Sequence, residues 1–371
     1  MSAFGDIYRG KRVLLTGHTG FKGSWLSLWL SKLGADVVGV SIDIPTKPSL
    51  FELCGIAELV DHRVGDVRDL EAMKALVAEV QPDIVFHLAA QPLVRLSYVD
   101  PVTTVDTNVM GTVNVLEAVR GWGGTAAIVV VTSDKCYHND GRREGYRETD
   151  PMGGHDPYSM SKGAAELVVD SWRSSYFLKA DSPVRLASGR AGNVIGGGDW
   201  AADRIVTDSI AALVAGRPIE VRNPLATRPW QHVLEPLSGY LWLGHGLLTG
   251  RRVDAGWNFG PDQDNIRNVE QLVDELLRCW GSGSWVQSSE AGAPKEAMAL
   301  SLNIEKAKAE LDWRPVWEFS RTIVETASWF KSWSEGGNDI RSLTSTQIDR
   351  YVTDAAAASI AWSTEPGLQP A

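Results

Sequence analysis

The sequence predicts an α/β fold built on a doubly wound parallel sheet. Three observations lead to this prediction. Apolar strand-like runs alternate with helix-like segments through the first half of the chain, the runs are apolar throughout, and a glycine-rich turn joins the first run to the first helix. Strands that are apolar on both faces are typical of parallel sheets, because crossover helices cover both sides.

The expected elements follow one another along the chain. RVLLT, at 12–16, is a strand, WLSLWLSKLGA is a helix that ends near Gly34, and DVVGVSID is a second strand. VDHRVGDVRD holds a short third strand, a helix follows from about 70 to 80, and PDIVFHLAA holds a fourth strand. A helical stretch from about 101 to 120 precedes the strand AAIVVV, and a long helix follows DPYSMSK to about 177. This order of strands and helices predicts βαβ units.

The character of the sequence changes near residue 190. RAGNVIGGGDW is loop-like, and segments with Arg, Pro and Trp then alternate with helices such as VEQLVDELLRCW. We therefore expect a first domain at 1–190, to which a segment at about 230–260 returns. A smaller substrate-binding lobe is expected at 191–335, and a peripheral C-terminal extension at 336–371.

Composition excludes several classes of protein. The 371 residues carry a formal net charge of −10, which disfavours sequence-independent binding to nucleic-acid phosphates. The N-terminus lacks the apolar core of a signal peptide, and no apolar run is long enough to cross a bilayer, so a cytoplasmic location is expected. Three scattered cysteines imply no disulfide framework, and Cys136 with His138 supplies only two ligands, so no metal site is expected.

The glycine-rich turn predicts a dinucleotide site. Gly17, Gly20 and Gly23 form a G-x-x-G-x-x-G pattern, with Thr19, Phe21 and Lys22 between them, at the junction of a strand and a helix. Such glycines permit a tight turn and let backbone N–H groups approach a pyrophosphate, as in Rossmann-type domains. A plain strand-to-helix turn is the alternative interpretation.

Four further residues are candidates for contacts with the cofactor. Ser41 stands at the end of the second strand, where an NAD site usually has an acid, and no arginine is there to accept the extra phosphate of NADP. Asp66 and Val67 follow the third strand and are expected near the adenine, although Asp66 is equally interpretable as an acid at a helix N-terminus. Thr107 is expected to line the groove.

Tyr158 and Lys162 form a Y-x-x-x-K pair, one helical turn apart on the same face. A lysine cation beside a phenol lowers the pKa of the phenol, so that tyrosinate can take a hydroxyl proton. The lysine can also hydrogen-bond a nicotinamide ribose. A solvated helix face is the alternative for the pair alone.

A family resemblance is carried by GHTGFKG, HLAAQ and PYSMSK, which together resemble the extended short-chain dehydrogenase/reductase superfamily. Within it, QPLVRLS, TSDKCY, DPYSMSKGAAELV, RAGNVIGGGDWA and NPLATRPWQHVLEPLSGYL are similar to the CDP-glucose 4,6-dehydratases, and the similarity extends from residue 11 to about 335. The resemblance implies bound NAD, a nucleotide-sugar substrate, and a role in deoxysugar biosynthesis, including that of lipopolysaccharide O-antigen. It also implies cofactor contacts from Leu88, Ala89, Ala90 and Gln91.

The resemblance assigns chemistry to TSDKCY. Such an enzyme oxidises C4 of the sugar, eliminates water across C5 and C6, and returns the hydride to C6. Tyr158 would take the C4 hydroxyl proton, Ser133 would hydrogen-bond the C4 oxygen, and Asp134, kept protonated by burial, would protonate the departing hydroxyl. Lys135 stands where dTDP-glucose relatives carry Glu. Either its pKa is lowered and it removes the C5 proton, or it stays charged and stabilises the enolate.

Residues beyond the catalytic strand are candidates for holding the substrate. We expect Asn193 to meet the diphosphate or the sugar, and Arg95 to lie near the sugar. Phosphate recognition is expected from Arg204, Arg222, Arg228 and His232. The preference for cytosine rests on the resemblance alone.

Two other functions remain open. A nucleotide-sugar 4-epimerase needs only the tyrosine, the lysine and the hydroxyl residue, and has no use for Asp134 and Lys135. A catalytically silent dinucleotide-binding protein would be free to lose Tyr158 or Lys162. Family members commonly dimerise through the helices that correspond to 101–120 and 158–177, so a homodimer or a dimer of dimers is expected.

Overall fold

The computed structural model describes residues 3–142, 144–288 and 300–364. Its centre is a seven-stranded sheet, all of whose neighbouring strands pair in parallel, in the order β11-β6-β5-β4-β1-β2-β3. The predicted α/β fold with a doubly wound sheet is confirmed. The strands are β1 (Arg12–Thr16), β2 (Asp36–Ser41), β3 (Asp61–Val64), β4 (Ile84–His87), β5 (Ala126–Val131), β6 (Val184–Arg190) and β11 (Gly256–Asn258).

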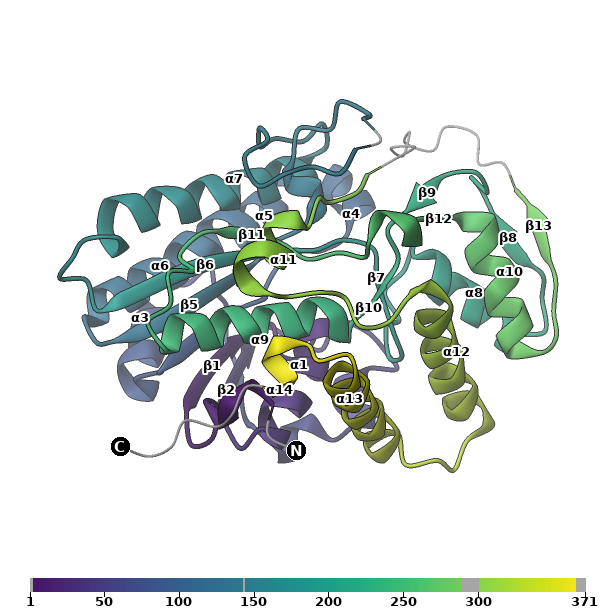
Figure 1. Ribbon diagram of the computed structural model, residues 1–371, viewed down its shortest axis with the longest axis horizontal. Helices are drawn as coiled ribbons and strands as arrows, with labels where there is room; N and C mark the ends of the chain where they lie inside the picture. The colour runs from purple at the N-terminus through teal and green to yellow at the C-terminus, as the bar shows by residue number, and fades with distance from the viewer. Residues whose placement is uncertain (1–2, 143, 289–299, 365–371) are drawn as a thin grey trace.

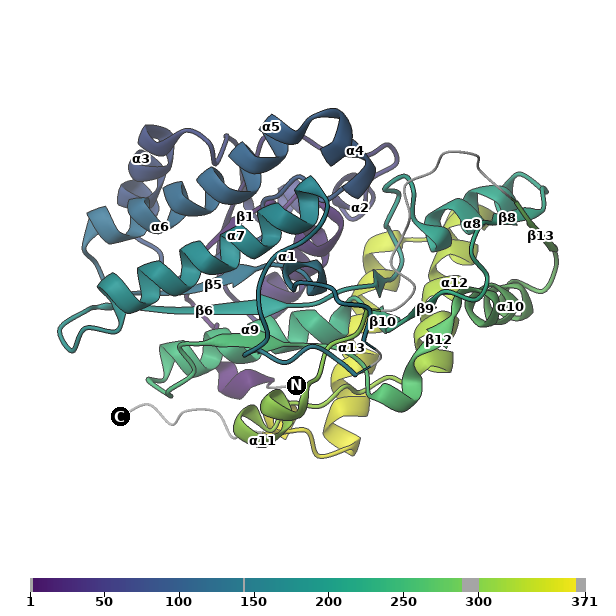
Figure 2. The same cartoon turned by 90° about the horizontal axis from the view of Figure 1, so that it is seen from above.

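Helices cover both faces of this sheet (Figures 1 and 2). One face carries α3 (Leu70–Val80), α6 (Gly111–Trp122) and α7 (Pro157–Trp172), and the other carries α1 (Phe21–Lys32) and α9 (Leu234–Leu248). Side chains of β1 therefore alternate between two cores: Leu14 packs in the first, and Val13 and Leu15 pack in the second. Burial on both sides explains why the strands are apolar throughout.

Local signals set the ends of several helices. Asp69 caps α3 through the N–H of Ala72, and Asp156 caps α7 through the N–H of Ser159, with Pro157 in the first turn. The predicted helix from about 101 to 120 is α5 (Pro101–Val105) followed by a π turn (Asp106–Met110) and α6. A second π turn (Arg173–Phe177) ends α7.

A smaller lobe lies at one end of the sheet (Figure 2). Its main helices are α8 (Ile205–Val214), α10 (Val269–Trp280) and α12 (Phe319–Glu335). Its strands pair two by two: β7 (Val194–Ile195) with β10 (Gln231–His232), β8 (Ile219–Val221) with β13 (Trp285–Gln287), and β9 (Thr227–Arg228) with β12 (Arg267–Asn268). Between β10 and β12 the chain returns to the sheet as α9 and β11.

Short helical segments complete the described chain. They are η1 (Phe4–Asp6), α2 (Leu50–Leu53), η2 (Ile56–Glu58), α4 (Val94–Val99), η4 (Asp134–Cys136), η6 (Gln263–Asn265), α11 (Glu305–Leu311) and α14 (Ala361–Thr364). No helix in the described ranges has the length and apolar character that a membrane crossing requires.

The C-terminal segment is not the peripheral extension that the sequence suggested. Helix α13 (Ile340–Ala357) packs on α1 and α12, and its Tyr351 is fully buried and donates to Oε2 of Glu235 at 2.7 Å. Trp362 stacks on Phe4 and on Tyr351, near the N-terminus (Figure 1). The prediction failed because the segment is mostly alanine and polar residues, whereas its packing depends on two large buried aromatic side chains, Tyr351 and Trp362.

Candidate active site

A cleft of about 1880 Å³ lies between the carboxyl ends of the central strands and the smaller lobe. This is where open α/β sheets bind ligands. All the residues predicted for cofactor binding line it: Gly17, Thr19, Gly20, Phe21, Lys22, Gly23, Ser41, Asp66, Val67, Leu88, Ala89, Ala90, Gln91, Thr107, Tyr158 and Lys162. Its volume exceeds that of an ordinary single-ligand pocket, so there is room for two nucleotides.

Two positions of the turn between β1 and α1 have room only for glycine. A Cβ on Gly17, whose φ is +77°, would lie 2.7 Å from the backbone nitrogen of Ala89. A Cβ on Gly23 would lie 2.0 Å from the carbonyl oxygen of Gly17. The turn is therefore packed against the end of β4 and delivers the N-terminus of α1 to the cleft, where its free N–H groups suit a pyrophosphate.

Two predicted adenosine contacts already have protein partners. Ser41 Oγ lies 2.9 Å from Nδ1 of His18 and accepts the N–H of Thr19. The carboxylate of Asp66 accepts from the guanidinium of Arg68, with a shortest distance of 2.6 Å. The assignment of Ser41 to the ribose and of Asp66 to the adenine therefore stays a prediction.

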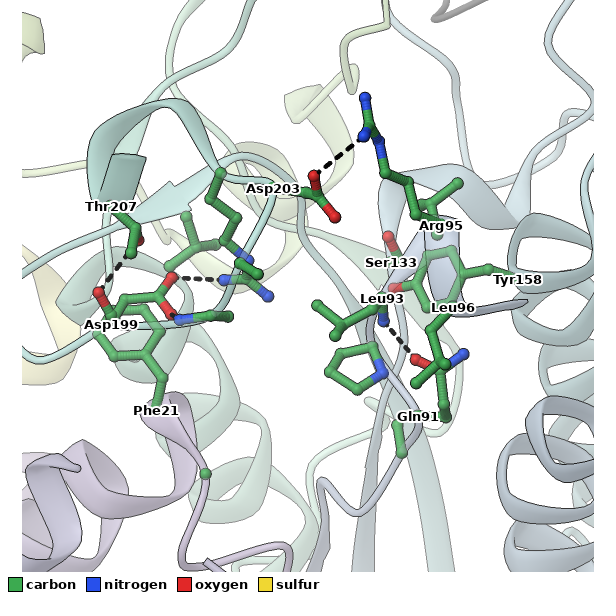
Figure 3. Close-up of a pocket in the computed structure, with 18 of the residues that line it drawn as sticks. Phe21, Gln91, Leu93, Arg95, Leu96, Ser133, Tyr158, Asp199, Asp203 and Thr207 are labelled. Carbon is green, nitrogen blue, oxygen red and sulfur yellow. Dashed lines mark hydrogen bonds and ion pairs between the residues drawn. The ribbon is translucent and has the colours of Figure 1, made fainter. Parts of the chain in front are cut away.

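Helix α7 places Tyr158, the tyrosine of the Y-x-x-x-K pair, at the end of β5. Tyr158 and Lys162 are both buried, and the ring of Tyr158 lies next to Ser133 (Figure 3). Burial raises the pKa of Tyr158 to about 12, although its polar interaction with Ser133 lowers it. Burial also lowers the pKa of Lys162 to about 8. In the protein alone, desolvation thus outweighs the expected effect of the lysine on the phenol.

Asp134 lies beside this pair, in the short helix η4. Its Oδ1 accepts from the hydroxyl of Ser133 at 3.0 Å, and its Oδ2 accepts from the amide of Asn193 at 3.1 Å. The carboxyl is 2% exposed. Lys135 is half-buried and lines the same cleft. Asp134 is therefore held by two neutral donors, Ser133 and Asn193.

The substrate candidates also line the cleft, with one exception. Arg95, Asn193, Arg204, Arg222 and Arg228 all line it. Arg95 of α4 pairs with Asp203 across the cleft at 3.3 Å, and Arg204 pairs with Asp199 at 2.5 Å (Figure 3).

His232 is the exception, and its predicted phosphate contact is wrong. The ring is fully buried between Trp25 and Trp317, with centroid distances of 5.7 and 4.9 Å, and it does not line the cleft. Burial lowers the pKa of His232 to about 3, so the ring is neutral and packs as part of the core. His232 is only four residues from Arg228, which does line the cleft. No pattern in the sequence indicated that the two side chains point in different directions.

Comparison with known proteins agrees with this geometry. The family model described as GDP-mannose 4,6 dehydratase matches residues 14–326. The CDP-glucose 4,6-dehydratase of Salmonella typhimurium is 48% identical over 353 residues, which cover 94% of this chain and 98% of that protein. This chain belongs to the GDP-mannose 4,6 dehydratase family.

Other members and neighbours are more distant. A dTDP-glucose 4,6-dehydratase of Xanthomonas campestris is 27% identical over 351 residues, covering 87% of this chain and 95% of that protein. The crystal structure of dTDP-glucose 4,6-dehydratase from Bacillus anthracis in complex with NAD has a TM-score of 0.72 at 22% identity, covering 87% and 97% of the two chains. The UDP-glucose 4-epimerase of Thermotoga maritima with UDP-glucose has a TM-score of 0.73 at 20% identity, covering 86% and 98%. These two structures confirm the fold that the sequence predicts for this chain.

The sequence did not predict the charged surroundings of Lys22. In this member of the family its side chain is half-buried in the cleft, 5.9 Å from the ring centroid of Tyr240. Desolvation, with the nearby cations Arg204 and Lys162, lowers the pKa of Lys22 to about 7. The sequence placed Lys22 only within the glycine motif, because no local pattern indicated that Arg204, Lys162 and Asp134 would be its neighbours.

A buried ion pair beneath the site was also missed. Glu166 accepts from Arg190 at 2.7 Å, from the hydroxyl of Ser188 at 2.8 Å and from that of Thr132 at 2.5 Å. It lies one turn after Lys162 and its negative charge raises the pKa of that lysine, against the effect of burial. The Y-x-x-x-K-x-x-x-E spacing was a signal that could have found it.

Proposed function

We propose that this chain converts CDP-D-glucose to CDP-4-dehydro-6-deoxy-D-glucose and water, with NAD as its cofactor. The observation that carries the proposal is the placement of Asp134 and Lys135 beside Tyr158 and Lys162 in one cleft. The 48% identity to a CDP-glucose 4,6-dehydratase supports the choice of reaction. Dehydration needs an acid and a second base beyond the tyrosine, and this arrangement supplies candidates for both.

The residues at the glycine turn fit a dinucleotide. The close approach of Gly17 to Ala89 brings the start of α1 to the cleft, and Lys162 of α7, on the other face of the sheet, lines the same cleft. When bound, NAD accepts a hydride from C4 of the sugar and returns it to C6. The neighbours that are solved with NAD, such as the dehydratase of Bacillus anthracis, support this cofactor.

Each catalytic side chain has one task in this proposal. Tyr158 takes the proton of the C4 hydroxyl while Ser133 hydrogen-bonds the C4 oxygen. Asp134, buried and within reach of Ser133, gives a proton to the C6 oxygen as it leaves. Oxidation at C4 acidifies the C5–H bond, so that Lys135 acts at C5 either as the base or as a cation that stabilises the enolate.

Arginines at the far side of the cleft are suited to the diphosphate of the substrate. Arg204, Arg222 and Arg228 line this region, and guanidinium groups bind phosphate oxygens in pairs. Asn193 donates a hydrogen bond to Asp134. We therefore assign it to positioning that carboxyl rather than to binding the sugar. Arg95 is proposed near the sugar, at the point where it meets Asp203.

The two alternatives are weaker. A 4-epimerase would leave Asp134 without a task, although it is buried, hydrogen-bonded and aimed at the cleft. A silent binding protein would not need Tyr158 and Lys162, which lie buried in catalytic arrangement. The epimerase neighbours share only about a fifth of their residues with this chain, and therefore indicate a common fold.

We further propose a homodimer or a dimer of dimers, formed through the α5 and α7 side of the sheet. Apolar side chains are unusually exposed there: Val99 is 81% exposed, Val102 77% and Leu167 60%. Exposed apolar surface of this kind favours an interface between subunits. A cytoplasmic location is proposed as well, because Cys54, Cys136 and Cys279 are all free thiols.

The proposed function is tested by incubating the protein and NAD with CDP-, dTDP-, GDP- and UDP-glucose and following each sugar by mass spectrometry. We expect CDP-glucose to lose one water. An unchanged mass with inverted C4 would assign the chain to the epimerases, and no reaction with any of the four would favour the silent binder.

A further inference from the structure

One face of β8 forms part of the cleft in the smaller lobe. Pro218, Glu220 and Arg222 line the cleft, whereas Ile219 and Val221, which alternate with them, are buried in the core. Successive side chains of a strand point to opposite faces, so the three lining residues share one face. Strand β8 lies in the smaller lobe, away from the central sheet (Figure 2). The cleft therefore extends from the glycine turn as far as β8.

The part of the cleft along β8 is where the proposed substrate would place its base, and this inference rests on the proposed function. In that proposal the sugar lies beside Tyr158, and the diphosphate meets arginines of the smaller lobe that include Arg222. A nucleotide sugar carries its base on the other side of the diphosphate from the sugar. The base is then left with the stretch of the cleft at Glu220.

The carboxylate of Glu220 differs from most acids that line the cleft in this lobe. Asp199 pairs with Arg204, and Asp203 pairs with Arg95. The residues that the structure describes give the Glu220 side chain neither a hydrogen bond nor an ion pair. An unpaired carboxylate repels an anionic diphosphate nearby. Its place in a nucleotide cleft is favourable only if the substrate presents a hydrogen-bond donor to it.

We propose that the Glu220 carboxylate accepts a hydrogen bond from the exocyclic amino group of cytosine and so selects CDP-sugars. Cytosine carries the N4 amino donor where thymine carries the O4 acceptor, as uracil also does, and carboxylates are suited to accept from N4. With uracil or thymine, the lone pairs of O4 would face the negative charge of Glu220. A partner that leaves a charge unpaired is rejected, which gives specificity.

The neighbours of Glu220 on β8 suit the rest of the nucleotide. Pro218 is exposed on the same face and supplies apolar surface for the flat side of a base. Arg222, on the other side of Glu220, supplies the cation for the diphosphate. The choice that Glu220 makes is among pyrimidines, because purines differ from cytosine in size as well.

The proposal is tested with Glu220→Gln, which keeps the size of the side chain, removes its charge and adds an N–H donor for O4. We expect kcat/KM for CDP-glucose, relative to UDP- and dTDP-glucose, to fall by roughly 10- to 100-fold. The change should lie in KM, because the base is remote from C4, C5 and C6. The dissociation constants of CDP and UDP, measured by calorimetry, should shift in the same sense without any catalysis.

Asp208→Asn is the matched control. Asp208 of α8 also lines the cleft, and its charged neighbours are Asp203 and Arg95, on the sugar side of the lobe. Its preference for CDP over UDP should equal that of the wild type. Both side chains are exposed, so neither substitution should disturb folding.

Two results would overturn the assignment of Glu220. One is a Glu220→Gln variant that keeps the wild-type preference in both catalysis and nucleotide binding. The other is an Asp208→Asn variant that loses the preference to the same extent. Failure of the wild type to dehydrate CDP-glucose would instead contradict the proposed function, and the affinities for CDP and UDP would still test Glu220.

Discussion

The amide nitrogen of Asn193, in the loop after β6, lies 3.1 Å from Oδ2 of Asp134 and donates a hydrogen bond to that carboxyl. Asn193 has a φ of +51°, a left-handed conformation that is uncommon outside glycine. Strained backbone of this kind clusters at functional sites. The backbone of the loop that follows β6 thus positions Asn193 to bind the proposed acid, Asp134.

Substituting Gly192 with Ala should displace the carboxyl of Asp134. The new Cβ would lie 1.9 Å from Oδ2, closer than any nonbonded contact allows. We expect kcat for dehydration to fall by about 100-fold, because small misplacements of a reacting group cost rates of this order. Gly121→Ala in α6 is the control, since a Cβ there has nothing within 4 Å. Equal activity in the two variants would contradict the account of Gly192.

Substituting Asp134 with Asn should block elimination while leaving C4 oxidation and cofactor binding in place. The amide cannot give up a proton to the leaving oxygen, so we expect a loss of roughly 100- to 10,000-fold in kcat. Reduced nicotinamide should accumulate on the protein, which its absorbance would reveal. Asp170→Asn, on the exposed surface of α7, serves as the control. Undiminished turnover in Asp134→Asn would remove the acid from the mechanism.

Glu235 should make stability depend on pH. It is fully buried, and burial raises its pKa to about 7, although the N–H groups of Trp317 and Val316 and the hydroxyl of Tyr351 favour the charged form. A raised pKa means that the folded state binds the proton more tightly, so this contribution is full below the unfolded pKa of about 4.3. It is lost as the pH rises to about 7.

The matched variant for this prediction is Glu235→Gln. The wild type should lose about 3 kcal/mol of unfolding free energy, relative to Glu235→Gln, between pH 4.5 and pH 8. Urea denaturation at several pH values would measure it. A constant difference between the two proteins across this range would show that Glu235 does not titrate in the folded state.

The dimer prediction is tested on α5. Val102 is 77% exposed and lies in the proposed interface, so Val102→Asp would bury a charge there on association. We expect a monomeric mass by light scattering at micromolar concentration, where the wild type is dimeric. Leu225→Asp is the control, because Leu225 is 69% exposed but lies in the smaller lobe. A wild type that is itself monomeric would refute the interface.

Much of the fold could be predicted from the sequence, because each βαβ unit has a recognisable local pattern of apolar residues and glycines. The helix predicted from about 70 to 80 is α3, and RVLLT is β1, with the glycine turn directly after it. The C-terminal segment was harder. Tyr351 and Trp362 are buried only because Glu235 and Phe4, more than a hundred residues away, provide partners. No local pattern carries information on such contacts.

The candidate site likewise has features that could be predicted from the sequence and features that could not. Residues within one motif, such as Tyr158 with Lys162, are related by helix geometry and could be predicted together. The direction of a single side chain could not: Arg228 lines the cleft while His232 turns into the core. Contacts between motifs, such as Asn193 with Asp134, also needed the structure, because β5 and the loop after β6 are adjacent only in the folded sheet.

The central claim is that one hydride leaves C4 and returns to C6 of the same sugar. The most direct test incubates the protein and NAD with CDP-glucose that carries deuterium at C4, and locates the label by NMR. We predict deuterium in the new C6 methyl group of a 4-keto product. Deuterium retained at C4, with that centre inverted or unchanged, would contradict the proposed dehydration.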